Sequence, residues 1–234
     1  MLSRIYYALF SRFVLSYHNR FRKNKNALKK LLIKNNQTRW LDLGSSTAFN
    51  EGFYFVDIID EILIPEKMRS NYFKMDFTKP LQPGDLNKMG EFDFIRMQHV
   101  FEHFTPADGL VVLENCHKLL NPGGYILISV PDLEIFAKRY LRKSLTHSWY
   151  FSEWAKTHLA KDAPPSFYFS LFAHSIVNQK HLWCYDKEGL IYQIRKSGKF
   201  SDIQQIGLFD NLCHIGFTHN RPLEDLCILA KKTK

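Results

Sequence analysis

The sequence lacks the features that assign a chain of this size to several common classes of protein. Its 234 residues contain no G-x-G-x-x-G run, which argues against the pyrophosphate-binding loop of a dinucleotide enzyme. The few cysteines are scattered without a C-x-x-C pair: Cys116, Cys184, Cys213 and Cys227. That pattern argues against a disulfide framework or a zinc ribbon and fits a reducing compartment. We find no internal repeat and no low-complexity segment, and a chain of this length is expected to form one large domain or a domain plus appendages.

Acidic residues are absent from the first 41 positions, which carry ten lysines and arginines. The rest of the chain holds 22 basic and 23 acidic residues, so the net charge of +9 belongs to this segment. Apolar residues near helical spacing predict a helix there. Arg4 and Arg12 interrupt its apolar run and no A-x-A-like site follows, which argues against a spanning helix or a cleaved signal peptide. The helix either lies on an anionic membrane surface or packs its apolar face on the sheet, and no nucleic acid is expected.

Residues 37–57 carry the strongest indication of function. An apolar β run from Trp40 to Leu43 ends at Gly44, and a second run from Phe53 to Val56 ends at Asp57. A strand, a glycine turn and a second strand that ends in a carboxylate form the nucleoside-binding half of a doubly wound sheet. The eight residues from Ser45 to Gly52 are too few for a full crossover helix, whose N-terminus a pyrophosphate needs. The pattern therefore favours S-adenosylmethionine, which carries no phosphate, over NAD or a flavin.

The remaining chain alternates β runs with helical patterns, which predicts a mostly parallel sheet with helices on both faces. Further strands are expected at 72–75, 92–97, 125–130, 201–209 and 226–231, and helices at 106–120, 133–142 and 186–196. The Asn-Pro-Gly-Gly run at 121–124 is expected to end the first of these helices.

Several runs in a fixed order make the pattern more specific. They are LDLGSS, the VD at 56–57, the MDF at 75–77, FDFIRMQHVFEHF and LLNPGGYILISVPDLE. This series resembles the class I S-adenosylmethionine-dependent methyltransferases, in particular a short bacterial type in which a shortened first loop leads directly to the VD strand. HLWCYDKEGL at 181–190 and the ending HNRPLEDLCILAKK are similar to that type. The resemblance implies an α/β, Rossmann-like, doubly wound sheet of seven mostly parallel strands. A basic N-terminal helical segment (1–36) would precede a methyltransferase domain (37–234) with an aromatic-rich acceptor-side insertion (135–180).

The resemblance also implies cofactor contacts at the carboxyl ends of the first four strands. Asp42 and Gly44 correspond to the motif that cradles the methionine end, and Asp57 to the carboxylate on the ribose. Asp76 would accept from the adenine amine while Phe77 packs on its ring. The full predicted cofactor set is Asp42, Gly44, Ser45, Asp57, Ile58, Asp76, Phe77, Gln98 and His99. Structural alternatives stay open, because Asp42 could instead bond loop amides and Asp57 could cap its strand. The family's second and third glycines are here Ser46 and Ala48.

The run His99-Val100-Phe101-Glu102-His103 is the chemically richest in the chain. If a helix begins near His99, then His99, Glu102 and His103 share one face. This trio is the predicted catalytic set, since an imidazole titrates near neutrality and can take a proton from an acceptor hydroxyl. The same groups could position the acceptor, or ligate a divalent metal as similar E-x-x-E-H runs do in some related methyltransferases. Because His99 replaces the first glutamate, no metal is predicted.

The acceptor side is expected after the fifth strand, where substrates bind in such sheets. Residues 140–185 hold eleven aromatics, which suit a sugar ring, an apolar acceptor or a packed cap. Asp132, His181 and Tyr185 are the predicted acceptor contacts, although Asp132 could equally cap the next helix. The sequence thus predicts a cytoplasmic methyltransferase, with membrane association left open, that acts on a hydroxyl or similar group of a small molecule or glycan precursor. The alternative is a catalytically silent S-adenosylmethionine-binding regulatory or scaffold module.

Overall fold

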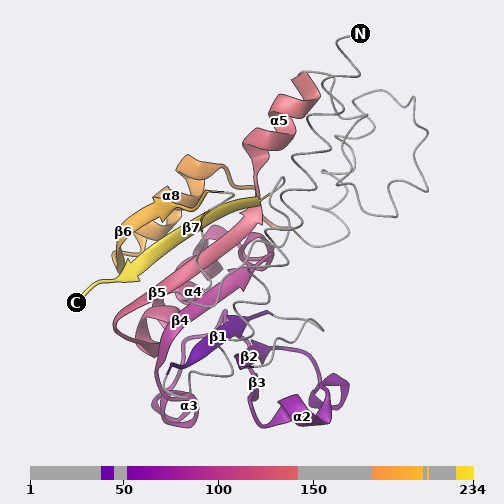
Figure 1. The fold of residues 1–234 in the computed structure, drawn as a ribbon, viewed down its shortest axis with the longest axis vertical. Coiled ribbons are helices and arrows are strands. Elements are labelled where there is room, and N and C mark those ends of the chain that lie inside the picture. The colour runs from indigo at the N-terminus through magenta and orange to yellow at the C-terminus, as the bar shows by residue number, and fades with distance from the viewer. Residues whose placement is uncertain (1–37, 45–51, 142–180, 208–209, 211–224) are drawn as a thin grey trace.

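The computed structural model describes residues 38–44, 52–141, 181–207, 210 and 225–234. Seven strands form one sheet in the order β3-β2-β1-β4-β5-β7-β6 (Figure 1). Their bounds are Trp40–Leu43 (β1), Tyr54–Asp57 (β2), Tyr72–Lys74 (β3), Phe92–Gln98 (β4), Leu120–Pro131 (β5), Phe200–Gln205 (β6) and Asp225–Lys232 (β7). Strands β1 to β5 pair in parallel, and β7 runs antiparallel to both β5 and β6. The predicted doubly wound, mostly parallel sheet is confirmed.

The described helices are α2 (Glu66–Arg69), α3 (Pro83–Met89), α4 (Pro106–Leu119), α5 (Leu133–Leu141) and α8 (Lys187–Lys196), with 3-10 turns η1 (Glu61–Leu63) and η2 (Phe101–His103). Local capping explains two of the starts. The Thr105 hydroxyl accepts from the Asp108 amide ahead of Pro106 at the head of α4, and the Asp186 carboxylate accepts from the Gly189 amide at the head of α8. These three long helices, α4, α5 and α8, lie within one or two residues of the predicted ranges.

Two predicted strand boundaries differ from the structure by four residues or more, the start of β5 and the end of β6. The Asn-Pro-Gly-Gly run at 121–124 does follow the end of α4, but the chain enters β5 at Leu120, so the run lies within a strand. Phe92 pairs with Leu120 and Phe94 with Tyr125, and the register shifts between them, which accommodates the extra residues as an irregularity. At the other edge, β6 ends at Gln205 rather than at 209.

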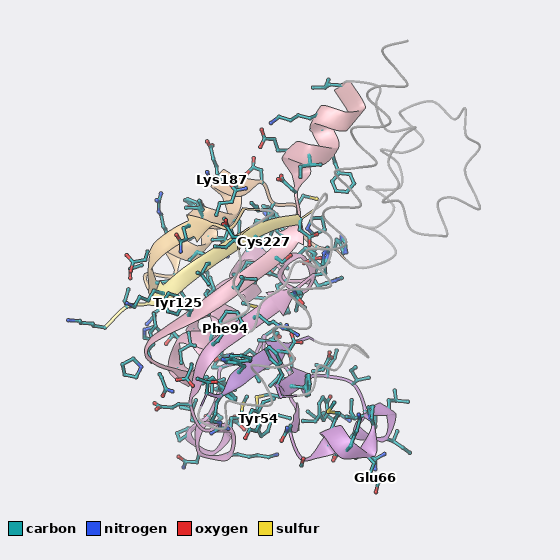
Figure 2. All side chains as sticks on the ribbon, in the orientation of Figure 1. Tyr54, Glu66, Phe94, Tyr125, Lys187 and Cys227 are labelled. Atoms are coloured by element: carbon teal, nitrogen blue, oxygen red, sulfur yellow. The ribbon has the colours of Figure 1, made fainter. Side chains whose placement is uncertain are left out.

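The sheet separates two apolar layers. Helices α3, α4 and α8 pack on one face through buried residues such as Met89, Leu113 and Ile194, and α4 lies behind β4 and β5 in Figure 1. The other face carries a second cluster in which Phe94, Leu127 and Cys227 come from neighbouring strands, joined by Met68 of α2. Phe94, Tyr125 and Cys227 are labelled along these strands in Figure 2. Each central strand is therefore buried on both faces, as its near-continuous apolar sequence requires.

The parallel pairing of β1 with β2 positions the site. Only residues 44–53 connect these neighbouring strands, fewer than a parallel crossover usually needs. The carboxyl ends of β1, β2, β3 and β4 therefore meet at one edge of the sheet. The predicted N-terminal helix (1–36) and most of the predicted insertion (135–180) lie outside the described residues. None of the described helices has the length and apolar character that crossing a membrane requires.

Candidate functional site

Gly44 marks the turn at the carboxyl end of β1. Its φ of +71° lies in the left-handed region, and its amide donates to the Val56 carbonyl at 2.8 Å. A Cβ built on Gly44 would lie 2.6 Å from a methyl carbon of Val100. Both the backbone conformation and the close approach of Val100 therefore require glycine here. Ser45, the next predicted cofactor contact, lies outside the described residues.

Asp42 forms a buried ion pair that neither sequence interpretation anticipated. Its Oδ2 lies 2.5 Å from Nη2 of Arg96, its register partner on β4, and the two side chains are only 6% and 3% exposed. The Arg96 guanidinium also lies 4.0 Å from the centre of the Phe53 ring. The Asp42 carboxylate is thus directed into the second apolar layer. If the predicted contact with the methionine end is made here, backbone groups next to Asp42 would make it rather than the Asp42 carboxylate.

Asp57 ends β2 at the same edge, half-buried. Its Oδ1 accepts from the amide of Ile58 at 2.7 Å, and the Ile58 side chain is exposed. The Tyr72 hydroxyl lies between the carbonyls of Asp57 and Ile59. Burial, together with the nearby Asp57 charge, raises the pKa of Tyr72 to about 12, so this hydroxyl stays a donor. The Asp57 carboxylate is consequently held at the strand end with its backbone fixed.

Asp76 and Phe77 follow β3 but differ in accessibility. Asp76 is exposed, and hydrogen bonds from the Thr78 hydroxyl and amide lower its pKa, which keeps it an ionised acceptor. Phe77 is 4% exposed and belongs to the main core, so little ring surface is left for an adenine. Asn115 of α4, fully buried, donates to the carbonyls of Phe77 and Lys79 and thereby fixes this loop. The structure supports Asp76 more than Phe77 as a cofactor contact.

His99 links three parts of the site. It follows Gln98, the last residue of β4, and has a φ of +56°, which is uncommon for a residue with a side chain. Its Nε2 lies 2.9 Å from Oδ1 of Asp225 on β7, and its Nδ1 lies 3.4 Å from Oε1 of Glu102. Burial alone would lower the pKa of His99, but the bond to Asp225 and the charge of Glu102 outweigh it and raise the pKa to about 9. Both ring nitrogens therefore face carboxylates.

The condition that a helix begins near His99 is not met. His99 itself is left-handed, residues 101–103 form the 3-10 turn η2, and α4 begins only at Pro106. His99 and Glu102 nevertheless meet, because the left-handed residue turns the chain back over the end of β4. The His103 ring instead meets that of His181, 4.7 Å away and nearly perpendicular to it. The predicted catalytic trio thus forms two neighbouring contacts rather than one helical face.

The predicted acceptor residues lie beside this turn. Asp132 and Tyr185 form an isolated parallel bridge, and the Leu133 amide donates to the Tyr185 carbonyl. The Asp132 carboxylate accepts from the Glu134 amide at the head of α5, and burial raises its pKa. Tyr185 is 2% exposed, packs against Phe101, and its hydroxyl has no hydrogen-bond partner among the described residues. Asp132 therefore caps α5 in this structure.

Sequence reasoning missed three buried polar residues that organise the site: Arg96, Asn115 and Asp225. Asp225 has a fully buried side chain and accepts from the Ser129 hydroxyl as well as pairing with His99. A signal existed for Arg96, since a cation inside the apolar run FDFIRM requires a buried partner, and Asp42 is the corresponding anion in the neighbouring run. No comparable signal identifies Asp225, whose partner lies 126 residues away.

Residues 17–190 match the model of a family described as a methyltransferase domain. Comparison with curated proteins gives no match. Among solved structures, an S-adenosylmethionine-dependent methyltransferase from Clostridium acetobutylicum ATCC 824 is similar with a TM-score of 0.51 at 12% identity, covering 95% of this chain and 98% of that one. That likeness agrees with the fold described above.

Two further solved structures are similar at lower scores. The N-methyltransferase NodS from Bradyrhizobium japonicum WM9, in complex with S-adenosylhomocysteine, has a TM-score of 0.48 at 11% identity, over 91% of this chain and 87% of that one. A methyltransferase from Archaeoglobus fulgidus has a TM-score of 0.46 at 19% identity, over 97% of this chain and 100% of that one.

Proposed function

We propose that this chain, which belongs to the class I S-adenosylmethionine-dependent methyltransferases through its methyltransferase domain, methylates a hydroxyl or similar group. The acceptor in this proposal is a small molecule or glycan precursor. The observation that carries the proposal is the set of groups gathered where the parallel strands end. The glycine turn at Gly44 follows β1, the half-buried carboxylate of Asp57 ends β2, and the ionised carboxylate of Asp76 follows β3.

These groups fit the methyl donor chemically. Asp57 can accept from two ribose hydroxyls and Asp76 from an exocyclic amine, since an ionised carboxylate offers only acceptors. Gly44 lets a ligand approach the backbone at the end of β1, where a side chain would collide with Val100. Arg96 neutralises Asp42 below this turn. When bound there, S-adenosylmethionine supplies an electrophilic methyl group on its sulfonium.

Positioning is the main task left to the protein, because methyl transfer is an in-line displacement. His99 acts as a positioning residue in this proposal: Asp225 holds one ring nitrogen and Glu102 faces the other, so neither is open toward an acceptor. His103 is half-exposed beside this pair and is the better placed of the two histidines to meet an acceptor. The acceptor would enter from the side of η2 and residues 181–185.

The cofactor assignment is tested by calorimetric titration with S-adenosylhomocysteine, with NAD as a comparison ligand. Asp57→Ala should weaken S-adenosylhomocysteine binding about ten- to hundred-fold, the loss of charge-assisted bonds of roughly 1.5–3 kcal/mol. Asp60→Ala is the matched control, because it removes the same charge from an exposed carboxylate that pairs with Lys74 instead. Equal affinity of Asp57→Ala and wild type, with both folded, would refute the assignment, as would measurable NAD binding.

A screen of hydroxyl acceptors then separates an enzyme from a silent cofactor-binding module. Turnover of the methyl donor with any acceptor supports the enzyme. Tight S-adenosylhomocysteine binding without turnover across the screen supports the regulatory or scaffold alternative.

A further inference from the structure

Glu102, His103 and His181 bring three potential metal ligands together beside the cofactor edge. Among the described residues, they are a group whose ligand atoms all lie within 4.8 Å of one another. Oε1 of Glu102 is 3.9 Å from Nε2 of His181, and the two histidine rings meet edge to face. Glu102 and His103 come from η2, whereas His181 is contributed by a segment almost eighty positions further along the chain.

The Glu102 carboxylate is buried, and its basic neighbours are histidines at the outer limit of an ion pair. The residue is 1% exposed, and neither carboxylate oxygen has a hydrogen-bond partner among the described residues. The nearest basic atoms are Nδ1 of His99 at 3.4 Å and Nε2 of His181 at 3.9 Å, both beyond a good charge-assisted bond. Burying a carboxylate in this way costs several kcal/mol unless a cation or a set of donors offsets it. The single positive charge of His99 is shared between Glu102 and Asp225, so two buried carboxylates face one cation and Glu102 can take a second positive partner.

The backbone already holds the two halves of the group in register. The carbonyl of Glu102 accepts from the amides of both Leu182 and Trp183, at 2.8 and 3.1 Å. These bonds fix the chain immediately after His181 to the residue that carries the buried carboxylate. His181 is 9% exposed, whereas His103 is half-exposed and lies on the accessible side. Such a group is preorganised by main-chain bonds and needs only side-chain movement to close.

The geometry points to a binding site for a first-row divalent cation, Zn²⁺ being the best match, with Glu102, His103 and His181 as its protein ligands. Two imidazoles and one carboxylate are the donor types that such ions prefer. With bonds of about 2.0–2.2 Å, ligand atoms around zinc stand roughly 3–3.5 Å apart, so the three side chains close by about 1 Å. Three protein ligands leave a fourth position open, as in catalytic rather than structural zinc sites.

The open position suggests what the ion does, and this part rests on the proposed function. His99 ties Glu102 to the end of β4, so the ion lies on the acceptor side of the methyl-donor edge. An acceptor oxygen bound at the fourth position would be held there and made more acidic by the ion. The substrate class is accordingly an acceptor with a hydroxyl that can ligate zinc.

The test uses the full chain, stripped of metal with a chelator, and Zn²⁺ or Co²⁺ as the probe. Elemental analysis after desalting should give about one zinc per chain, and Co²⁺ should produce the visible absorption of a low-coordinate site. Glu102→Gln, His103→Asn and His181→Asn should each weaken binding at least about 10- to 100-fold, since even outer-shell changes cost that much. His117→Gln is the control, because His117 lies on α4 beside Phe200, away from the group.

Absence of zinc binding by the wild-type chain would overturn the inference and leave a buried glutamate served by neighbouring histidines. Zinc held equally by wild type and by folded His181→Asn and Glu102→Gln would overturn it too, by locating the ion elsewhere. S-adenosylhomocysteine titration in parallel separates the two proposals. A chain that binds S-adenosylhomocysteine but no zinc loses only the metal site, and one that binds zinc but no S-adenosylhomocysteine loses the proposed function and keeps the site.

Discussion

Replacing Arg96 with methionine should destabilise the protein far more than the loss of a surface ion pair. The substitution leaves the Asp42 carboxylate in the second apolar layer without its cation, at a position where both side chains are at most 6% exposed. Removing one partner of a buried pair typically costs about 3–5 kcal/mol, because the remaining charge keeps its desolvation penalty. The lost contact with the Phe53 ring adds to the effect. Since small domains have only about 5–15 kcal/mol in total, Arg96→Met should lie close to unfolding.

The measurement is urea denaturation followed by circular dichroism, with two comparison variants. Lys74→Met breaks an exposed pair in which the side chains are 54% and 64% exposed, and should cost far less because water already solvates both charges. The double variant Asp42→Leu/Arg96→Met removes both charges and should recover most of the loss, because an apolar pair of similar size suits the same layer. The reasoning fails if Arg96→Met costs no more than Lys74→Met, or if the double variant is as unstable as the single one.

Three further changes test other parts of the argument. Gly44→Ala should weaken S-adenosylhomocysteine binding and destabilise the chain by more than the roughly 1–2 kcal/mol of left-handed strain, because the new Cβ would meet the stiff Val100 side chain. Gly44→Ala/Val100→Ala should relieve the clash but not the strain, and a single variant as stable as wild type would contradict this. Burial and the nearby lysines lower the pKa of His117, so the unfolded chain takes up a proton more readily than the folded one. The free energy of unfolding from urea melts should therefore fall as the pH drops below about 6.5, and less steeply in His117→Gln; equal slopes against pH in the two proteins would count against this. Deleting residues 1–36 should abolish the cooperative thermal melt if that segment packs on the sheet. An intact melt, together with sedimentation of the full chain on anionic vesicles that salt reverses, would instead indicate that the segment lies on a membrane surface.

The site was partly predictable because its strand-end residues follow from local pattern. An apolar β run that stops at a glycine or a carboxylate places that residue at the carboxyl edge whatever the helices do, which is why Gly44, Asp57 and Asp76 fall where the sequence places them. Residues 101–103 were harder to predict. His99 and Glu102 were expected to share a face only if a helix began near His99, whereas a left-handed residue brings the same two side chains together by a turn.

The sequence by itself determined which residues lie at the ends of the first strands and the class of cofactor, because periodicity, glycine turns and the short first loop act over a few residues. Only the tertiary structure decided which charges are paired. Arg96 neutralises Asp42 across 54 positions, Asp225 holds His99 across 126, and the backbone after His181 binds Glu102. Such pairings depend on which strands and loops become neighbours after folding. Burial then favours each of them strongly, since an unpaired charge in these layers costs a large share of the chain's stability.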